Sequence, residues 1–512
     1  MSPELDDREL SPPRVAVAVL LLLAAAFGAL VLVRHALAAT PKAAQAAWYA
    51  PYVDATLPPA YQFQDPGSDP ARAVVLGFVV STPGAPCQPS WGAVEPLTGS
   101  GVATDLERRI ARLQQAGGTP IVSFGGQRND EPAVGCSSEP ALERAYRLVV
   151  DRYRLTTIDF DLEGAALGDA AANARRAAAV ASLQHGLRSH GRKLAVWLTL
   201  PTGPSGLTPE GVGEIDTMIA AGVDLAGVNL LAMDFTPAPA DSSAMWETVQ
   251  RAATAAQRQI LTSYTRARIR LTTAEAWAKL GLTPMIGVND DNAGVFDLQD
   301  ARELLRFAQL HRIGRVSIWS LNRDTPCGPN VVSPEVVSNY CSGLGQDALA
   351  FSRVLDKLTG RPSAAAAHVT VERPLVADNP RTSPYPIWDS SDAYPGGYKV
   401  VWHGSVYRAK YYNQGYVPDA PVAQEWSTPW LLLGPVLPGE HAPTIPTLPR
   451  GTYPAWSPRV SYRAGTRVLF HGLPYEAKWY TVGDTPEALP TVTPPSPWQP
   501  LFTIPGEPPP HG

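Results

Sequence analysis

Short apolar runs alternate with amphipathic helical patterns along residues 48–325. Eight of these runs have the length and composition of buried strands. They lie at 48–53, 73–81, 120–124, 157–161, 194–200, 227–233, 284–288 and 315–320. Helical periodicity follows several of them, at 105–115, 170–189, 209–221 and 298–310. Eight strands that alternate with helices predict an α/β fold, a (β/α)8 TIM barrel, whose functional residues lie at the C-terminal ends of the strands.

The pattern changes at Tyr385, where the alternation stops and the chain begins to repeat itself. Seventeen residues from Tyr385 to Trp430 recur 68 positions later, so two copies of one module are present. Each copy has short apolar runs and no helical period, which predicts a small all-β module. Prolines at 438, 443, 446 and 449 should keep the spacer between the copies extended.

The N-terminus contains one long apolar segment. Residues 15–33 carry no charge and are flanked by Arg14 and Arg34. A segment of this length just spans a hydrocarbon core of ~30 Å, whereas a cleaved signal peptide usually has a shorter apolar region of about 7–15 residues. We therefore expect a single-pass signal anchor in the cell membrane with the bulk of the chain outside. Secretion after cleavage near Ala38 is the alternative, since residues 36–38 offer a small-x-small site.

Composition narrows the partners and the compartment. A net charge of −5 without a basic stripe argues against a nucleic-acid partner. No two cysteines form a CxxC pair, so a structural zinc site is not expected. An even number of cysteines outside the cell predicts disulfides. We pair Cys87 with Cys136, which follow consecutive strands, and Cys327 with Cys341, which bracket one short loop. Four buried free thiols are the alternative.

The chemistry concentrates in the run Thr-Ile-Asp-Phe-Asp-Leu-Glu at 157–163. Asp159, Asp161 and Glu163 alternate with apolar residues, so a strand places all three carboxylates on one face. In a barrel interior these charges repel one another, which raises the pKa of at least one carboxyl group. A carboxylic acid that stays protonated near neutral pH is what a glycosidic oxygen needs in order to leave.

The position of these carboxylates on one strand limits the mechanism. An ordinary glycosidase needs a second carboxylate across the sugar ring, about 5 Å or more away, which neighbours on one strand cannot provide. Substrate-assisted catalysis removes this difficulty, because the N-acetyl oxygen of the substrate is then the nucleophile. Asp161 would orient that amide, and Glu163 would protonate the leaving oxygen and then activate water. A calcium site is the alternative for the acidic triplet, but an apolar strand is not an oxygen-rich loop; we expect no metal and no cofactor.

The same run resembles the DxxDxDxE signature of glycoside hydrolase family 18, the chitinases. Three other segments resemble family motifs in the same order along the chain. Ser-Phe-Gly-Gly at 123–126 is similar to SxGG on the third strand, 233–235 is similar to Met-x-Tyr on the sixth, and Trp319 resembles the tryptophan that floors the cleaved subsite. The resemblance covers roughly residues 48–345.

The resemblance implies a set of residues that contact substrate around the catalytic Glu163, Asp161 and Asp159. They are Ser123, Met233, Asp234, Phe235 and Trp319. We add Tyr49 as a further candidate, together with Asn289, which lies near a strand end. A buried amide that satisfies backbone groups is the alternative for Asn289. Two positions depart from the family pattern. Thr156 replaces the first Asp of the signature, and Phe235 replaces a tyrosine whose hydroxyl helps to hold the N-acetyl group.

The repeated modules resemble chitin-binding modules of carbohydrate-binding families 5 and 12, whose pattern includes Ala-Lys-Trp-Trp and a closing Pro-Trp. The resemblance implies that paired aromatics carry the binding surface: Tyr411 and Tyr412 in the first copy, Trp479 and Tyr480 in the second. Adjacent aromatics on a short strand would point to opposite faces, so a core role for both is awkward. Flat aromatic rings stack on the C–H face of pyranose rings. Trp388 and its counterpart at 456 are better interpreted as core.

These observations give one domain plan and one preferred function. The expected parts are a cytoplasmic tail (1–14), the signal anchor (15–33), the barrel (45–345), a linker region (346–383), module 1 (384–435), a proline-rich linker (436–451) and module 2 (452–504). The preferred function is a retaining chitinase that cleaves β-1,4-linked N-acetylglucosamine polymers. The alternatives are a surface glycan-binding protein with a weak or inactive barrel, and a hydrolase of another N-acetylglucosamine polymer.

Overall fold

The computed structural model describes residues 46–65, 67, 71–97, 105–235, 244–290, 294–329, 331, 337–361, 377–420, 427–442, 444–445, 447–486 and 496–508. All of them belong to the unit Ala46–Gly512, and the unit Met1–Gln45 lies outside the described residues. The anchor expected at 15–33 therefore lies outside them as well. In the part of the chain that is described, no helix is both long enough and apolar enough to cross a bilayer.

Parallel strands close into a barrel, which confirms the fold predicted from the apolar pattern. β1 (Trp48–Tyr49) and β2 (Tyr52–Asp54) share the first position, because β1 pairs with β14 (Arg315–Val316) and β2 with β3 (Ala73–Thr82). The circuit continues through β6 (Thr119–Gly125), β7 (Thr157–Asp161), β8 (Ala195–Gly203), β10 (Leu225–Leu231) and β11 (Leu280–Thr283). Each pairing around this circuit is parallel.

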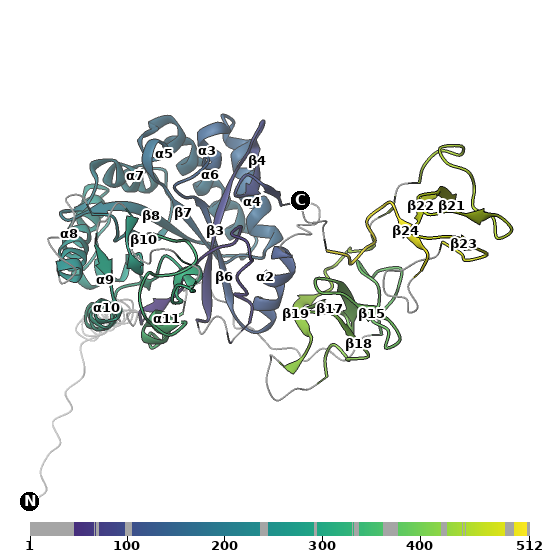
Figure 1. Ribbon diagram of the computed structural model, residues 1–512. Helices are drawn as coiled ribbons and strands as arrows, with labels where there is room; N and C mark the ends of the chain where they lie inside the picture. Colours follow the sequence, from purple (N-terminus) through teal and green to yellow (C-terminus); the bar gives the residue numbers. More distant parts are fainter. Residues whose placement is uncertain are drawn as a thin grey trace, which may run out of the picture. The chain divides into compact units, whose positions relative to one another are not determined.

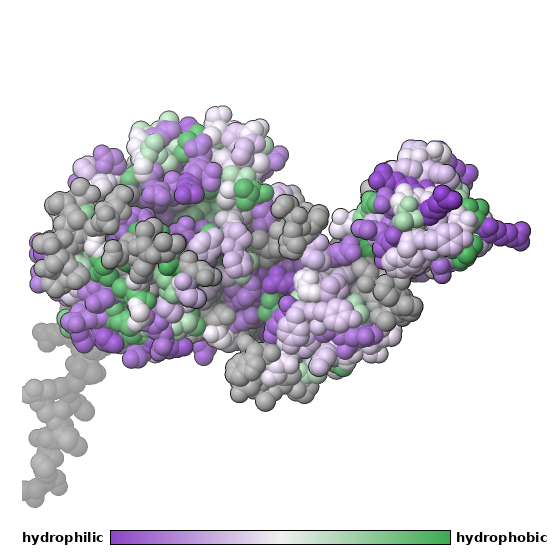
Figure 2. Space-filling view, viewed as in Figure 1, coloured by the Kyte–Doolittle hydropathy of each residue, from purple (hydrophilic) through white to green (hydrophobic). Residues whose placement is uncertain are grey.

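Helices surround the strands as an outer layer (Figure 1). They are α2 (Leu106–Gln115), α3 (Pro132–Gly135), α4 (Glu139–Arg152), α5 (Gly164–Gly168), α6 (Ala170–Ser189), α7 (Pro209–Ala220), α8 (Ala244–Arg266), α9 (Thr273–Ala278), α10 (Leu298–His311) and α11 (Ala350–Leu355). Side chains of Asp169, Thr208 and Asp297 cap the first turns of α6, α7 and α10, which fixes where those helices begin. On the face seen in Figure 2, hydrophilic residues cover much of this layer, as amphipathic helices require.

Two boundaries differ from the sequence prediction. The seventh strand was expected at 284–288, but β11 begins at Leu280, directly after the end of α9, and its ladder ends before Pro284, which has no N–H to donate. The barrel was expected to end at 345. However, Phe351 and Leu355 of α11 are fully buried in the main core cluster, because they cover apolar surface that the other helices leave open.

Short elements extend the barrel beyond the ends of its strands. β4 (Ala85–Trp91) folds back on β3, and β5 (Glu95–Pro96) folds back on β4. β9 (Gly206–Leu207) folds back on β8, and β12 (Gly287–Val288) pairs with β13 (Val295–Phe296). Both predicted disulfides are confirmed. Cys87 on β4 is bonded to Cys136 at the end of α3, and Cys327 is bonded to Cys341.

The two C-terminal modules have the same strands at the same spacing as their sequence repeat. Module 1 contains β15 (Ala393–Tyr394), β16 (Lys399–Trp402), β17 (Ser405–Ala409), β18 (Asn413–Gln414) and β19 (Trp430–Pro435). Module 2 contains β20 (Ser461–Tyr462), β21 (Arg467–Phe470), β22 (Leu473–Ala477), β23 (Thr481–Val482) and β24 (Trp498–Pro500). Each forms a two-stranded and a three-stranded antiparallel sheet. Trp388 packs in the core of module 1, as expected.

A buried ion-pair cluster lies among the outer helices. Arg176 of α6 contacts Glu131 at 2.9 Å and Glu214 of α7 at 3.0 Å, and all three side chains are almost completely buried. One guanidinium thus faces two carboxyl groups, and within the described residues Oε2 of Glu214 has no hydrogen-bond partner. Burial, together with the charge of Glu131, raises the pKa of Glu214 to about 7 although Arg176 opposes this shift.

We expect the barrel to lose stability as the pH rises through the range between the ordinary pKa of glutamate and about 7. The folded state holds a proton on Glu214 that the unfolded chain has already released, so folding is favoured below this range and penalised above it. Between about pH 5 and pH 8, the free energy of unfolding should fall by roughly 1–3 kcal/mol more in the wild type than in Glu214→Gln. Calorimetry of the barrel transition measures this difference. Glu247→Gln, at an exposed glutamate of α8, is the control, and parallel pH curves for wild type and Glu214→Gln would contradict the assignment.

Candidate active site

The row of carboxylates lies at the C-terminal end of β7. Asp159 and Asp161 belong to the strand and are buried in the barrel interior, while the alternating Ile158 and Phe160 join the core between strands and helices. Glu163 continues the extended backbone as the residue that precedes α5, and its side chain is half-buried. The period-two prediction for this run is therefore confirmed.

Asp159 is the fully hydrogen-bonded member of the row. Its two oxygens accept from Tyr52 Oη (2.9 Å), Ser123 Oγ (2.7 Å), Thr199 Oγ1 (2.8 Å) and Arg315 Nη1 (2.6 Å). These donors come from β2, β6, β8 and β14, so one carboxylate joins strands from around the barrel. With four donors and complete burial, Asp159 supports its neighbours and does not itself face a ligand.

Arg315 is the functional residue that sequence analysis missed. It is fully buried, its guanidinium pairs with Asp159, and Trp48, Tyr52 and Trp197 surround it with ring faces. The sequence offered one signal, a single arginine in the apolar run of the last strand. However, that signal does not say which of the three carboxylates the arginine meets, because 156 residues separate it from Asp159.

Asp161 is the member with unused hydrogen-bonding capacity. Burial is the main cause that raises its pKa well above the ordinary value, and the charges of Glu163 and Asp159 add to this while Arg315 opposes it. In the described part of the chain, its Oδ1 atom is buried and has no hydrogen-bond partner. A buried oxygen without a partner is costly, so Asp161 is prepared to bind a group that enters from the cleft.

Glu163 has the electrostatics of a proton donor. Burial and, secondarily, the charge of Asp234 raise its pKa to about 7. Near neutral pH a substantial fraction of Glu163 therefore carries its proton, and loss of the proton leaves a base at the same position. Asp161 and Glu163 thus give the site two carboxyl groups with raised pKa values side by side.

The position of Asp234 depends on a loop from the next strand. Asp234 follows β10 in a left-handed conformation (φ 49°), and its backbone N–H donates to Oδ1 of Asn289 at 3.3 Å. The Asn289 amide donates in turn to the carbonyls of Met285 and Gly287. Asn289 was expected to contact substrate, but it is fully buried and holds backbone groups instead, as in the alternative interpretation.

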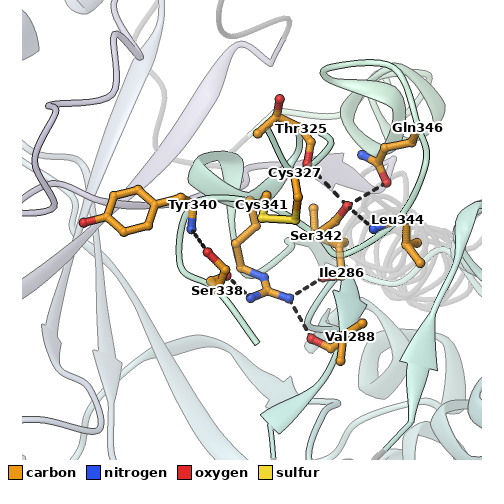
Figure 3. The surroundings of a disulfide bond; sticks show 11 residues. Ile286, Val288, Thr325, Cys327, Ser338, Tyr340, Cys341, Ser342, Leu344 and Gln346 are labelled. Atoms are coloured by element: carbon orange, nitrogen blue, oxygen red, sulfur yellow. Dashed lines mark hydrogen bonds between the residues drawn. A yellow bond between two sulfur atoms is a disulfide. The ribbon is translucent and has the colours of Figure 1, made fainter. Parts of the chain in front are cut away.

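A disulfide-bonded loop fixes this support (Figure 3). Arg323 of η2 (Leu321–Arg323) donates to the carbonyls of Ile286 and Val288, next to Asn289, and to the carbonyl of Ser338. Ser338 lies close to Cys341 in the loop that Cys327–Cys341 closes. The neighbouring Ser342 carbonyl accepts from the Val288 N–H at 2.9 Å. The loop that orients Asp234 is therefore held by one guanidinium and one disulfide.

An aromatic floor lies beside the carboxylates. The half-buried ring of Trp319 stacks on Phe78, with centroids 5.7 Å apart and planes 23° apart, and Tyr52 packs against both rings. Gly126 of the Ser-Phe-Gly-Gly segment makes room for this floor, because a Cβ there would lie 2.8 Å from the Phe78 ring. A Cβ on Gly125 would lie 2.1 Å from the carbonyl oxygen of Asp161. Both glycines therefore serve the site through close packing.

The other predicted contact residues divide into two groups. Met233 is half-buried near Asp234, whereas Phe235 is only 1% exposed and belongs to the main core cluster. The prediction for Tyr49 is wrong about its surroundings. Its hydroxyl lies 3.1 Å from Ser352 of α11, on the outer side of the strand, while Tyr52, three residues later, reaches Asp159. The sequence alone does not tell which of Tyr49 and Tyr52 faces the barrel interior, because that depends on the register of the first strand.

The paired aromatic residues of both modules are exposed to solvent. Tyr411 and Tyr412 lie in a bend between β17 and β18, and Trp479 and Tyr480 lie in the same bend of module 2. All four are exposed. They are not on a strand, as the sequence argument assumed, and the bend is what allows two adjacent rings to reach solvent together.

Comparisons with known proteins agree with both parts of the chain. Residues 455–499 match the carbohydrate-binding module family 5/12. The chain is 37% identical over 291 residues to a probable bifunctional chitinase/lysozyme of Escherichia coli (strain K12), and 35% identical over 286 residues to endochitinase 11 of Metarhizium anisopliae. These matches cover 56% and 54% of this chain but only 32% and 52% of the two relatives.

A solved structure covers the barrel. Active domain 2 of a thermostable chitinase from Pyrococcus furiosus, in catalytic-site mutants complexed with chito-oligosaccharides, is 30% identical with a TM-score of 0.52. The similarity covers 61% of this chain and 94% of that chain. The catalytic domain of a hyperthermophilic chitinase from the same organism is 29% identical, with 98% of its chain covered and the same TM-score.

Replacement of Asp234 by asparagine should lower the pKa of Glu163. The like charge of Asp234 favours the protonated form of Glu163, so its removal should shift the pKa downward from about 7, on the order of one pH unit. Burial remains, so the pKa should stay above that of an ordinary glutamate. Carboxyl-carbon NMR titration, with the signal assigned by its loss in Glu163→Gln, measures the shift. Asp216→Asn on α7 is the control, and an unchanged Glu163 titration in Asp234→Asn would contradict the coupling.

Proposed function

We propose that this chain, which belongs to glycoside hydrolase family 18, the chitinases, hydrolyses β-1,4 linkages between N-acetylglucosamine units with retention at the anomeric carbon. The observation that carries the proposal is the pair at the end of β7. Asp161 has a buried oxygen with no partner among the described residues, and Glu163 two residues later has a pKa of about 7. One group can bind an amide while the other protonates a leaving oxygen.

The proposed reaction uses the N-acetyl group of the substrate as nucleophile. Glu163 donates its proton to the glycosidic oxygen as the C1–O bond breaks, and the acetamido oxygen forms the new bond to C1. Asp161 accepts or shares the amide proton and stabilises the positive charge that develops on the amide. In the second half, water attacks C1 and gives a proton to Glu163 while the bond between C1 and the acetamido oxygen breaks. Asp161 returns its share of the amide proton, which restores the acetamido group and the protonated Glu163.

The surroundings of the pair support each role. Arg315 forms an ion pair with Asp159, whose oxygens are fully hydrogen-bonded, so Asp161 and Glu163 are the members of the row that can meet a substrate. Trp319, stacked on Phe78, offers a flat apolar surface for a sugar ring. The hydroxyl that the family places at 235 is absent here, and the Phe235 ring packs in the core, so the amide depends more strongly on Asp161.

A second mechanism, in which Asp234 is the nucleophile, also has to be considered. Its charge acts on Glu163, so a carboxylate does lie near the acid, and a conventional double displacement would use it as nucleophile. The two routes differ in their substrates. Substrate-assisted cleavage requires the N-acetyl group, whereas attack by Asp234 would also cleave de-N-acetylated chains and would leave a glycosyl ester on Asp234.

We propose that both modules hold the protein on the polymer through Tyr411, Tyr412, Trp479 and Tyr480. Two weak modules on one chain raise the residence time on an insoluble substrate through effective concentration. The E. coli relative has a name that pairs chitinase with lysozyme, so peptidoglycan is the polymer to test beside chitin.

Glu163→Gln and Asp161→Asn should each abolish most of the activity. We expect kcat/KM for a chromogenic chitobioside to fall by at least about 100-fold in either full-length variant, because the acid or the amide-orienting group is lost. In the wild type, kcat/KM should decline above about pH 7 as Glu163 loses its proton. Glu210→Gln, at an exposed glutamate of α7, is the control. An inactive wild type that still binds chitin would replace the enzyme by the glycan-binding alternative, and cleavage of fully de-N-acetylated chains would favour attack by Asp234.

We also propose that residues 15–33 anchor the protein in the cell membrane with the barrel outside. The uncharged apolar stretch between Arg14 and Arg34 supports this proposal, and the two disulfides favour an oxidising compartment. The mature protein should fractionate with membranes and retain residues 1–38 in its intact mass. A soluble product that begins after Ala38 would contradict the anchor and establish secretion.

A further inference from the structure

The two modules have equivalent strands, and one of the exposed positions at which they differ is fixed by the same hydrogen bond in both. The indole N–H of the buried Trp430 donates to the carbonyl of Tyr416 at 2.7 Å, and that of Trp498 donates to the carbonyl of Asp484 at 2.8 Å. A glycine in the left-handed conformation precedes both residues, with φ of 76° at Gly415 and 83° at 483. The sequence offset of 68 also relates them. The same hydrogen bond thus fixes the same backbone site, which carries a tyrosine in module 1 and an aspartate in module 2.

The side chains at this site have different surroundings. The carboxylate of Asp484 accepts a hydrogen bond from the hydroxyl of Thr481. The residue equivalent to Thr481 in module 1 is Asn413, whose amide instead donates to the Tyr411 carbonyl at 3.2 Å. Module 1 therefore lacks the hydroxyl that holds the aspartate in module 2, and Tyr416 is 60% exposed.

Tyr416 is a third exposed aromatic ring close in sequence to Tyr411 and Tyr412. Tyr411 and Tyr412 are 53% and 66% exposed, so module 1 presents three tyrosines within six consecutive residues. Module 2 presents Trp479 and Tyr480, which are 46% and 64% exposed. Their chemistry is that of flat apolar faces with a polar tip.

The ring of Tyr416 does not serve the core of module 1. Tyr416 is not a member of the buried core cluster of this module, so its exposed ring is free to meet a ligand. A carboxylate at the same site is soluble and cannot stack on a sugar face. A phenol ring can cover the C–H face of a pyranose and also donate from its hydroxyl to an acetamido or hydroxyl oxygen.

We propose that Tyr416 is a third sugar-binding residue of module 1, so that module 1 binds an N-acetylglucosamine polymer more tightly, and over a longer stretch of chain, than module 2. This inference rests on the proposed function of the modules and refines it. The two copies are then unequal: module 1 provides most of the affinity, and module 2 adds avidity.

The test uses full-length protein that carries Glu163→Gln, so that the ligand is not cleaved. In one background Trp479→Ala and Tyr480→Ala silence module 2, and binding to insoluble chitin and to soluble chitohexaose reports module 1. In the other, Tyr411→Ala, Tyr412→Ala and Tyr416→Ala silence module 1, and the same ligands report module 2. Each background should bind chitin with a measurable Kd.

In the first background, Tyr416→Asp, which copies module 2, should weaken binding by about 5- to 20-fold, and Tyr416→Ala should do the same. Tyr416→Phe should retain most of the affinity, because stacking survives. In the second background, Asp484→Tyr, which copies module 1, should strengthen binding. Val417→Asp adds a charge at an exposed neighbour and keeps all three rings, so it controls for charge alone.

The outcomes separate this inference from the proposed function. If neither background binds chitin, the targeting role of the modules is wrong. If both backgrounds bind but Tyr416→Asp and Tyr416→Ala leave the Kd unchanged, the inference is overturned while targeting stands. Circular dichroism would detect unfolding of module 1 by Tyr416→Asp. In that case the affinity of Asp484→Tyr for chitin in the second background is the test, and no gain in affinity overturns the inference.

Discussion

The ion pair between Asp159 and Arg315 is the interaction on which the rest of the site depends. It lies in the barrel interior, joins the fourth strand of the circuit to the last, and receives three further hydroxyl donors. Three carboxylates on one strand face would otherwise repel strongly. The guanidinium of Arg315 pairs with Asp159 and also opposes the raised pKa of Asp161, which burial and the charges of Glu163 and Asp159 produce. Breaking a buried pair of this kind leaves an uncompensated charge and commonly costs about 3–5 kcal/mol, so structure and chemistry are coupled at this point.

Other side chains hold the site residues in place through hydrogen bonds to backbone groups. Arg323 and the Cys327–Cys341 loop hold the carbonyls beside Asn289, and Asn289 orients the backbone of Asp234, whose charge acts on Glu163. Gly125 and Gly126 allow the third strand to approach Asp161 and the Phe78–Trp319 floor. Burial is the main cause of the raised pKa of Glu163, and the charge of Asp234 adds to it. The supports of Asp234 come from loops that follow different strands, which is the usual arrangement of a TIM-barrel site.

The modules show how one scaffold can carry two surfaces. Buried aromatic residues such as Tyr394, Tyr407 and Trp430 recur in module 2, and the indole of Trp430 or Trp498 fixes the same backbone carbonyl in each copy. Exposed residues around β18 and β23 differ: module 1 has Tyr411, Tyr412 and Tyr416 where module 2 has Trp479, Tyr480 and Asp484. Selection on folding constrains the core positions, whereas binding depends on which flat rings the bend presents. Two copies of unequal affinity are a natural result of such a duplication.

The sequence alone determined the barrel, the repeat and the carboxylate face of β7, because each rests on periodicity or on a constant offset. It favoured the two disulfide pairs over free thiols from the order of the predicted strands and loops. Tertiary structure decided what distant residues do to one another. It alone paired Arg315 with Asp159, directed Tyr52 and not Tyr49 into the barrel, turned Asn289 into a backbone support and placed Phe235 in the core. It also extended the barrel through α11, whose apolar residues have no partner until the strands close. Periodicity reports which face of an element is buried, but the identity of the neighbour across that face depends on register and closure, which no local pattern contains.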